Sequence, residues 1–348
     1  TTSVTYAVAP NAYLLSRREV LKGTAGLAVL VAFSGCGSST TDPEYVVPGA
    51  NDLYVGEKHL VWDALGNQYE LDPYLHRITR VDAEGTAVWT AQHDDTVTFT
   101  DDGDAISAWE EQPNATGLNL IVTPTDIASG PDGALYVVSH TSSSIVVLDA
   151  ETGALVRTIG SHGSGDGELG SVMDIAVDAQ GRLFVADGRN HCVHIFQPDG
   201  THLKTFGEFG TEEDHHLNHP RALAISADAE VHVVDAGNAR LQVYDLDGTW
   251  IRSYGGYGES DAGFMAPRSV GIDPLGNSYV ADPVAAALQM YTPTGEHLQR
   301  LDSITVGGEK AYPLRVSWDP HGKPYILVHV PVVEPLAEEF LTDKTEPG

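Results

Sequence analysis

From Asp126 onward, a cationic or acidic side chain recurs about every 47 residues just before a short apolar segment, and Lys58 occupies a similar place 68 residues before Asp126. A guanidinium group donates two parallel N–H bonds, so the arginines are suited to bind the carboxylate of a small anion or of a peptide C-terminus. The aspartates could equally pair with the arginines and form an internal structural network. Both interpretations stay open for six candidates: Lys58, Asp126, Asp174, Arg221, Arg268 and Arg315.

Histidines gather in the segment "EDHHLNHP" at 213–220. Neutral imidazole nitrogens bind transition metals, so His215, His216 and His219 are metal candidates, together with Asp214. The alternative is a solvent-exposed loop without a metal. A second segment, "HDDTVTFTDDGD" at 93–104, offers carboxylates for calcium but lacks the spaced order of a calcium-binding loop. We assign no cofactor, and Zn²⁺ and Ca²⁺ are the ions that remain to be tested.

The chain also contains an internal repeat. A small residue that opens an apolar strand recurs at Gly66, Gly133, Gly181, Ala229, Gly276 and Gly322. An aspartate follows four of these anchors by six residues, at Asp72, Asp187, Asp235 and Asp282. Aspartate oxygens accept backbone N–H bonds in turns, so we interpret these four as turn-capping groups rather than as catalysts.

A repeat of this length holds about four short strands, and such a unit cannot bury both faces of its sheet alone. The sequence therefore predicts an all-β fold, a six-bladed β-propeller of four-stranded antiparallel blades over residues 51–335. The longer first interval predicts an insertion at about 89–117. The sixth copy lacks its ending, so we expect residues near 51–62 to pair with that blade and close the ring.

The segment "GEFGTEEDHHLNHPRALAISADAEVHVVDAGNARLQVYDLDG" at 207–248 resembles an NHL repeat. The usual form of that repeat has a Gly-x-x-Gly loop, a proline, an apolar strand, Val-x-Asp, then Asn-x-Arg and Asp-Gly. The resemblance is strong from about 155 to 300, weaker at 57–90 and 124–155, and fades after 325. It implies a six-bladed propeller, in a family with protein-binding, RNA-binding and enzymatic members.

The segments "TPTDIA" at 123–128 and "VADGRNHCVHIF" at 185–196 are similar to segments of a catalytic NHL propeller, the peptidyl-hydroxyglycine amidating lyase, whose channel mouth carries zinc-binding histidines, an arginine and a tyrosine. This chain has Pro220-Arg221 where the lyase has Pro-His, and Arg189 where the lyase has its tyrosine. A guanidinium group offers no lone pair to zinc. We therefore expect a non-enzymatic protein. The alternative is a metal-dependent lyase or hydrolase with relocated ligands, for instance His59, His140 or His162.

The first residues resemble an export signal of the twin-arginine type. Arg17 and Arg18 precede a short apolar stretch that ends in "FSGC", which is similar to a lipobox. This pattern predicts an export signal at 1–35, a lipid anchor on Cys36 and a flexible tether at 36–50. We expect the protein to be exported to the cell envelope or surface. The remaining thiol, Cys192, is expected to be a small buried side chain.

The chain is strongly acidic, with a formal net charge of −30. A field of this sign repels phosphates, which makes nucleic acid an unfavourable partner. The segment at 336–348 is acidic and proline-flanked, and we expect it to form a loose C-terminal tail. The sequence thus favours an exported, lipid-anchored binding or scaffold protein for a protein, a peptide or a small anionic ligand.

Overall fold

The fold is described from a computed structural model, and the regular secondary structure of its described residues is almost entirely β-strand. Among the described residues, the helical structure is one short 3₁₀ helix, η3 (Ala236–Asn238). None of the described residues belongs to a helix that is long and apolar enough to span a membrane. The structure describes residues 29–31, 53–56, 59–63, 65–72, 77–82, 85–92, 98–99, 105–106, 124–139, 143–211, 214–258, 260–302, 304–306, 309–318 and 322–330. The predicted tether and C-terminal tail lie outside these residues.

Five antiparallel sheets each contain four strands that follow one another in the chain. We number them blades 1 to 5. Their strands are β3 (His59–Trp62), β4 (Gln68–Asp72), β5 (Arg77–Val81) and β6 (Ala87–Gln92); β9 (Pro124–Ser129), β10 (Ala134–Ser139), β11 (Ile145–Asp149) and β12 (Leu155–Ile159); β15 (Val172–Val177), β16 (Leu183–Asp187), β17 (Cys192–Phe196) and β18 (His202–Phe206); β21 (Pro220–Ile225), β22 (Glu230–Asp235), β23 (Arg240–Asp245) and β24 (Trp250–Gly255); β25 (Ser269–Ile272), β26 (Ser278–Asp282), β27 (Ala287–Tyr291) and β28 (His297–Asp302).

One further four-stranded sheet among the described strands contains both parallel and antiparallel pairs. Strands β31 (Tyr312–Trp318) and β32 (Pro324–His329) form an antiparallel hairpin. Strand β2 (Leu53–Gly56) adds to β32 in parallel, and β1 (Val29–Val31) pairs with β2. The prediction that residues near 51–62 pair with the last repeat is confirmed, because Tyr54 is in register with Tyr325. The prediction of six uniform antiparallel blades holds for five. The mixed sheet departs from it because two of its strands come from the N-terminal part of the chain.

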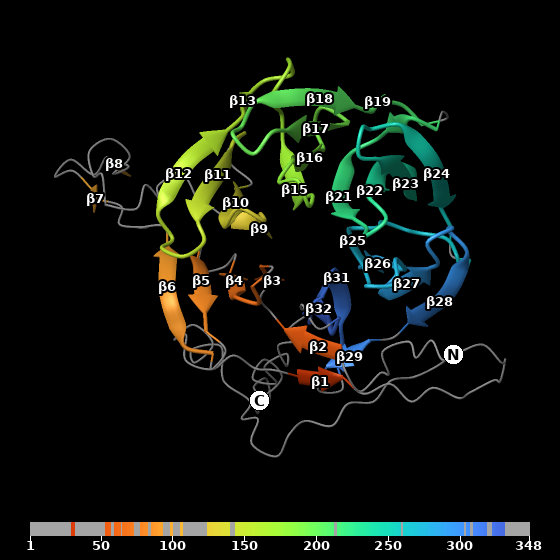
Figure 1. The fold of residues 1–348 in the computed structure, drawn as a ribbon. Helices are drawn as coiled ribbons and strands as arrows, with labels where there is room; N and C mark the ends of the chain where they lie inside the picture. Colours follow the sequence, from red (N-terminus) through yellow and green to blue (C-terminus); the bar gives the residue numbers. More distant parts are fainter. Residues whose placement is uncertain are drawn as a thin grey trace, which may run out of the picture.

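The first strand of each blade and strand β31 of the mixed sheet lie at the centre of a ring, and the last strand of each blade lies at the periphery (Figure 1). Each first strand contacts the first strand of the next sheet, and β31 contacts β3, so the described strands form a closed circle. The ring of Trp62 in blade 1 packs on Tyr325 in the mixed sheet, with centroids 4.6 Å apart. A propeller of four-stranded blades is therefore the observed architecture.

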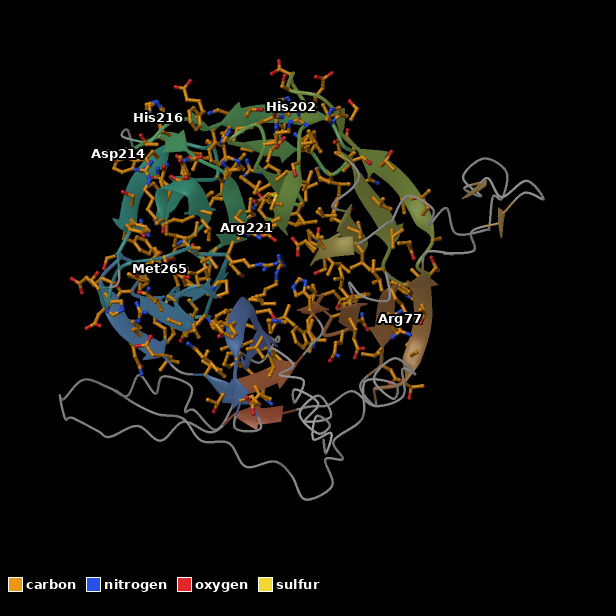
Figure 2. All side chains as sticks on the ribbon, turned by 180° about the vertical axis from the view of Figure 1, so that it is seen from behind. Arg77, His202, Asp214, His216, Arg221 and Met265 are labelled. Carbon is orange, nitrogen blue, oxygen red and sulfur yellow. The ribbon has the colours of Figure 1, made fainter. Side chains whose placement is uncertain are left out.

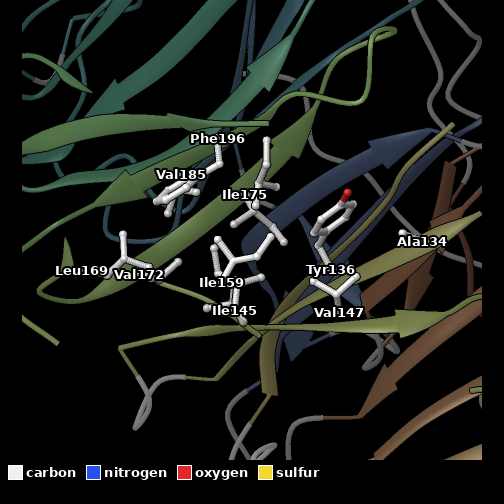
Figure 3. Close-up of a cluster of buried hydrophobic side chains, with 12 residues drawn as sticks. Ala134, Tyr136, Ile145, Val147, Ile159, Leu169, Val172, Ile175, Val185 and Phe196 are labelled. Atoms are coloured by element: carbon white, nitrogen blue, oxygen red, sulfur yellow. The ribbon is translucent and has the colours of Figure 1, made fainter. Parts of the chain in front are cut away.

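Apolar side chains fill the spaces between neighbouring blades. Between blades 2 and 3, for example, Tyr136 and Val147 face Ile175 and Val185, and all four are buried (Figure 3). Equivalent clusters join blades 1 and 2, 3 and 4, 4 and 5, and blade 5 with the mixed sheet. Each sheet thus gains from its neighbours the cover that it cannot provide for itself, at about 25 cal/mol per Å² of apolar surface buried.

Short connectors carry the chain from the outer strand of one blade to the first strand of the next. In two of them a two-residue parallel pairing forms, between β13 (Ser161–His162) and β14 (Glu168–Leu169), and between β19 (Glu208–Phe209) and β20 (His216–Leu217). The connector between blades 4 and 5 contains a single β-bridge between Tyr257 and Phe264. The mixed sheet is preceded by the hairpin of β29 (Thr305–Val306) and β30 (Glu309–Lys310).

The predicted insertion at 89–117 overlaps blade 1, because β6 extends to Gln92. The insertion therefore begins after that residue. Its described part is the short pair of β7 (Thr98–Phe99) and β8 (Ala105–Ile106), which lies apart from the ring in Figure 1. The rest of the acidic segment proposed for calcium lies outside the described residues.

The repeated aspartates act as turn-capping groups where the structure describes their side chains. Asp187 accepts hydrogen bonds from the backbone N–H groups of Asn190 (3.0 Å) and Arg189 (3.2 Å) in the turn that follows β16. It also accepts bonds from Gly170 (2.6 Å) and Ser171 (3.0 Å) in the preceding connector. Asp235 and Asp282 make similar contacts in their own blades. Each carboxylate therefore fastens a connector to the blade that follows it.

Candidate functional site

The candidate site lies where the first strands of the sheets meet at the centre of the ring. The pairing of these strands with their neighbours shifts register near their starts, between Val172 and Asp174, between Pro220 and Ala222, and between Pro313 and Arg315. The residue in the bulge and the residue after it consequently have different surroundings. Arg221, in a bulge, is exposed, whereas the next residue, Ala222, is 1 % exposed.

Arg315 is the centre of a charged network in the ring. Its guanidinium group forms ion pairs with the carboxylates of Asp126 on β9 and Asp174 on β15. The same group lies 3.1 Å from Nε2 of His59 on β3. Asp126 and Asp174 are 1 % and 4 % exposed, so these charges are removed from water. The structure brings together three of the six sequence candidates and adds His59 to them.

The two carboxylates also hold neighbouring blades together. Oδ2 of Asp126 in blade 2 accepts a hydrogen bond of 2.9 Å from the backbone N–H of Ile175 in blade 3. Oδ2 of Asp174 in blade 3 accepts a bond of 2.8 Å from the N–H of Leu223 in blade 4. Each aspartate thus uses one oxygen for Arg315 and the other for the next blade. This satisfies buried groups that would otherwise destabilise the fold.

Burial dominates the protonation of the network. It raises the pKa of Asp126 well above the ordinary value, with the nearby Asp174 carboxylate adding to the rise and Arg315 opposing it. Burial also lowers the pKa of His59 well below the ordinary value, and the positive charge of Arg315 acts in the same direction. His59 is therefore a neutral imidazole at pH 7. The Arg315 guanidinium remains charged, because its two carboxylate partners offset the effect of its own burial.

Arg221 and Arg268 are positioned differently from Arg315. Both are exposed, Arg221 at the start of β21 and Arg268 immediately before β25. The backbone N–H of Arg268 donates a 2.8 Å bond to the carbonyl of Ala281, which fixes its main chain beside blade 5. Strands β21 and β25 are in contact, so the two arginines belong to adjacent blades. Arg221 lies on the inner side of the ring (Figure 2). Lys58, the remaining candidate, lies outside the described residues.

The three histidines predicted to share a metal separate into two groups. Nε2 of His215 lies 3.4 Å from Oε1 of Glu208, and Nε2 of His216 lies 3.9 Å from the same atom. His219 instead packs edge-on against His191, with ring centroids 4.5 Å apart. The described structure therefore does not bring the three histidines together: the backbone at His219 is left-handed (φ 51°), and its ring lies against His191.

Glu208 is the residue that sequence reasoning missed at this cluster. It precedes His215 by seven residues and lies on the opposite side of the connector loop. Strands β19 and β20 pair Glu208 with His216, which brings the two side chains together. The Gly-x-x-Gly pattern signalled a closed loop but not which side chains would meet. In Figure 2 His216 and Asp214 lie near the periphery, whereas Arg221 lies on the inner side of the ring.

Two of the histidines proposed as relocated ligands lie in different parts of the described structure. His59 is buried beside Arg315, and His162 lies in the connector before blade 3, where its Nδ1 is 2.8 Å from Oγ of Ser143. His140 lies outside the described residues. Within the described part of the chain, the group of three side chains that could hold a metal ion is Glu208, His215 and His216.

Cys192 is 4 % exposed and unpaired, as the sequence predicted. Burial raises the pKa of its thiol to about 12, and the nearby Asp187 carboxylate adds to the rise. The thiol is therefore protonated at neutral pH and is a poor nucleophile. Cys36 lies outside the described residues.

Comparison with known proteins agrees with the NHL resemblance. The family model described as "NHL repeat" matches residues 174–196, which span most of β15 and all of β16 and β17. The chain is 34% identical over 110 residues to Protein lin-41 of Caenorhabditis elegans, a stretch that covers 31% of this chain and 9% of that protein. The chain thus spans less than a tenth of that relative's length.

Solved structures share the propeller fold. A streptogramin B lyase superimposes with a TM-score of 0.54 and 12% sequence identity, over 81% of this chain and 78% of that chain. A virginiamycin B lyase from Staphylococcus aureus gives a TM-score of 0.50 and 10% identity, over 74% of this chain and 73% of that chain. At such identities the likeness shows the fold alone. The chain is a β-propeller, and one segment of it, residues 174–196, matches the NHL repeat.

Proposed function

We propose that this protein is a non-enzymatic binding propeller that captures an anionic peptide or protein segment on the inner rim of its ring. The observation that carries this proposal is the difference between its arginines. Arg315 is neutralised by Asp126 and Asp174, whereas Arg221 and Arg268 are exposed on adjacent blades. The charged network occupies the first strands at the ring centre, and the two exposed guanidinium groups lie on adjacent blades beside it.

The net charge of the chain gives this rim its selectivity. In a protein with a formal charge of −30, an exposed pair of arginines is a local exception to a negative field. Extended anions such as nucleic acid are repelled by that field. A single carboxylate, such as a peptide C-terminus, experiences less repulsion and fits the paired N–H donors of a guanidinium group. The preferred ligand therefore carries its negative charge on a single carboxylate group and not along an extended chain.

The proposal is tested with a set of peptides that are synthesised in two forms, with a free C-terminal carboxylate and with an amidated one. Binding to the purified chain is measured by fluorescence anisotropy. We expect binding in the free-carboxylate form, with a loss of roughly 10 to 100-fold on Arg221→Ala or Arg268→Ala. Lys204→Ala is the matched control, because it removes one exposed positive charge from the outer strand β18.

Equal affinity for the free and amidated peptides would contradict the proposal. So would full affinity in the Arg221→Ala/Arg268→Ala double variant. Circular dichroism of each variant separates a lost contact from a lost fold.

The second candidate is a metal-dependent lyase or hydrolase of the propeller class. The observation that favours it is the Glu208, His215 and His216 group. That group lies in a connector at the periphery and not at the ring centre, where the lyase resemblance would locate a metal (Figure 2). The geometry therefore favours binding over catalysis.

Export and anchoring are proposed on the leader alone. The twin arginines Arg17 and Arg18 and the cysteine Cys36 carry this proposal. Strand β1 lies within the leader, so processing before Cys36 would remove β1 and leave β2 as the outer strand of the mixed sheet. With β2 in place, we propose that the mixed sheet serves as a sixth blade. Metabolic labelling with a lipid precursor tests the anchor, and label that survives Cys36→Ser would contradict it.

A further inference from the structure

We propose a binding site for one zinc-type transition metal dication, formed by Glu208, His215 and His216 in the connector between blades 3 and 4. Two imidazole nitrogens and a carboxylate oxygen are the donor set that zinc accepts in sites with three protein ligands and an open position. Magnesium and calcium prefer oxygen donors alone, so the two histidines select against them. The site is independent of the rim arginines.

The distances among the donor atoms fit a central ion. Two donors about 2.1 Å from a tetrahedral zinc ion lie roughly 3.4 Å apart. Nε2 of His215 and Oε1 of Glu208 are 3.4 Å apart, and Nε2 of His216 and the same oxygen are 3.9 Å apart. Both exceed the range of about 2.7 to 3.2 Å for a direct N–H···O bond. The donor atoms of the three residues all lie within 4.8 Å of one another.

The backbone beneath the site is held in place. The carbonyl of His216 accepts hydrogen bonds from Arg240 (2.8 Å) and from Gln242 (3.0 Å), both on β23. The next residue, Leu217, is fully buried between blades 3 and 4. The parallel pairing of β19 with β20 then fixes Glu208 opposite His216. Two of the three ligands thus project from a rigid frame, which reduces the entropy lost on binding an ion.

Gly210 provides the space for the His216 ring. A methyl group at Gly210 would lie 2.2 Å from Nδ1 of that ring, far inside van der Waals contact. No positive φ requires glycine at this position. An alanine at Gly210 would therefore displace the imidazole ring of His216 from its present position.

The other connectors show that the fold does not require these ligands. The pair that corresponds to Glu208 and His216 is Ser161 and Glu168 in the connector before blade 3. That connector keeps the buried leucine, Leu169, but has a serine in place of the first ligand. The buried residue is thus shared by the repeats, whereas the glutamate–histidine pair is an addition to one of them.

The test uses the full chain, purified without a histidine tag, and Zn²⁺ alone. Equilibrium dialysis with elemental analysis should show one high-affinity ion per chain. Co²⁺ in its place should give the visible absorption of a site with nitrogen and oxygen ligands. His216→Ala, His215→Ala and Glu208→Gln should each weaken binding by more than the roughly 10 to 100-fold that loss of an outer partner causes. Gly210→Ala should weaken it through displacement of the His216 ring.

His162→Ala is the matched control, because it removes a histidine from the equivalent connector before blade 3. It should leave zinc affinity unchanged. Circular dichroism and thermal unfolding without metal establish that each variant folds. The proposal is overturned if the folded ligand variants retain the affinity of the parent chain, or if His162→Ala reduces it as much as His216→Ala does.

Discussion

Arg315 and Asp174 form an ion pair across the ring although they are 141 residues apart in the chain. Arg315 belongs to the mixed sheet and Asp174 to blade 3, and neither sheet is the chain neighbour of the other. The same guanidinium holds Asp126 of blade 2. One side chain from the last sheet therefore ties two sheets from the first half of the propeller.

Loss of this tie should destabilise the fold strongly. Arg315→Met leaves two buried carboxylates without their cation, and we expect the free energy of unfolding to fall by about 3 to 5 kcal/mol. The measurement is urea denaturation followed by tryptophan fluorescence. Adding Asp126→Asn and Asp174→Asn should restore much of the loss. Arg300→Met, which breaks the more exposed pair with Asp302, is the control and should cost about 1 kcal/mol or less. An Arg315→Met chain as stable as the control would contradict the structural role.

The turn-capping role of the repeated aspartates can be tested at Asp187. Asp187→Ala removes an acceptor from four backbone N–H groups, at Gly170, Ser171, Arg189 and Asn190. Because the carboxylate is fully buried, we expect a loss of roughly 3 kcal/mol in the free energy of unfolding. Asp245→Ala, in an exposed turn, should cost about 1 kcal/mol. Hydrogen exchange at Gly170 and Ser171 should accelerate in the Asp187 variant alone.

Burial lowers the pKa of His232 to about 4, from an ordinary value of 6.5. The folded state therefore favours the neutral imidazole. The corresponding stability is fully present above pH 6.5 and is lost as pH falls from 6.5 toward 4, by about 3 kcal/mol at most. His232→Gln should unfold with a shallower dependence on pH across this window. Thermal unfolding at intervals between pH 7 and pH 4 measures both slopes, and parallel slopes would argue against a buried neutral histidine.

The connectors depend on a glycine that packs against a buried side chain. At Gly207 the backbone is left-handed (φ 84°), and an added Cβ would lie 2.5 Å from Leu217. Gly207→Ala combines backbone strain with overpacking, and we expect a loss of roughly 2 to 5 kcal/mol. Gly133→Ala has a similar φ of 77° but open space around the Cβ, so it isolates the cost of strain. If the two variants are equally stable in urea, the packing argument fails.

The contribution of β2 to the stability of the mixed sheet can be tested by shortening the chain. A chain that starts at residue 36 lacks β1 but retains the pairing of β2 with β32. We expect its melting temperature to stay near that of the parent, because β1 contacts the sheet through β2 alone among the described pairings. Removal of residues 53–56 as well exposes the edge of β32 and should lower the melting temperature. Equal melting of the two shortened chains would show that β2 does not close the ring.

The sequence alone determined the repeat and the propeller, because the alternation of apolar residues and the turn residues are local properties that recur with the blade. It also identified the turn-capping aspartates and the buried Cys192. The meeting of β2 with β32 followed from the missing end of the last repeat, although its parallel direction did not.

Only the tertiary structure decided which charges meet. Arg221 and Arg268 stand eight residues before their repeat anchors and are exposed, whereas Arg315 stands seven residues before its anchor and forms ion pairs with two aspartates. In blade 4 and in the mixed sheet the register of the first strand shifts by one residue at this point, so consecutive side chains have different surroundings. The closeness of Glu208 to His215 and His216 likewise depends on the folded shape of the connector, in which Leu217 is buried. Ion pairing and metal ligation depend on distances of a few ångströms between residues far apart in the chain, and ring closure sets those distances.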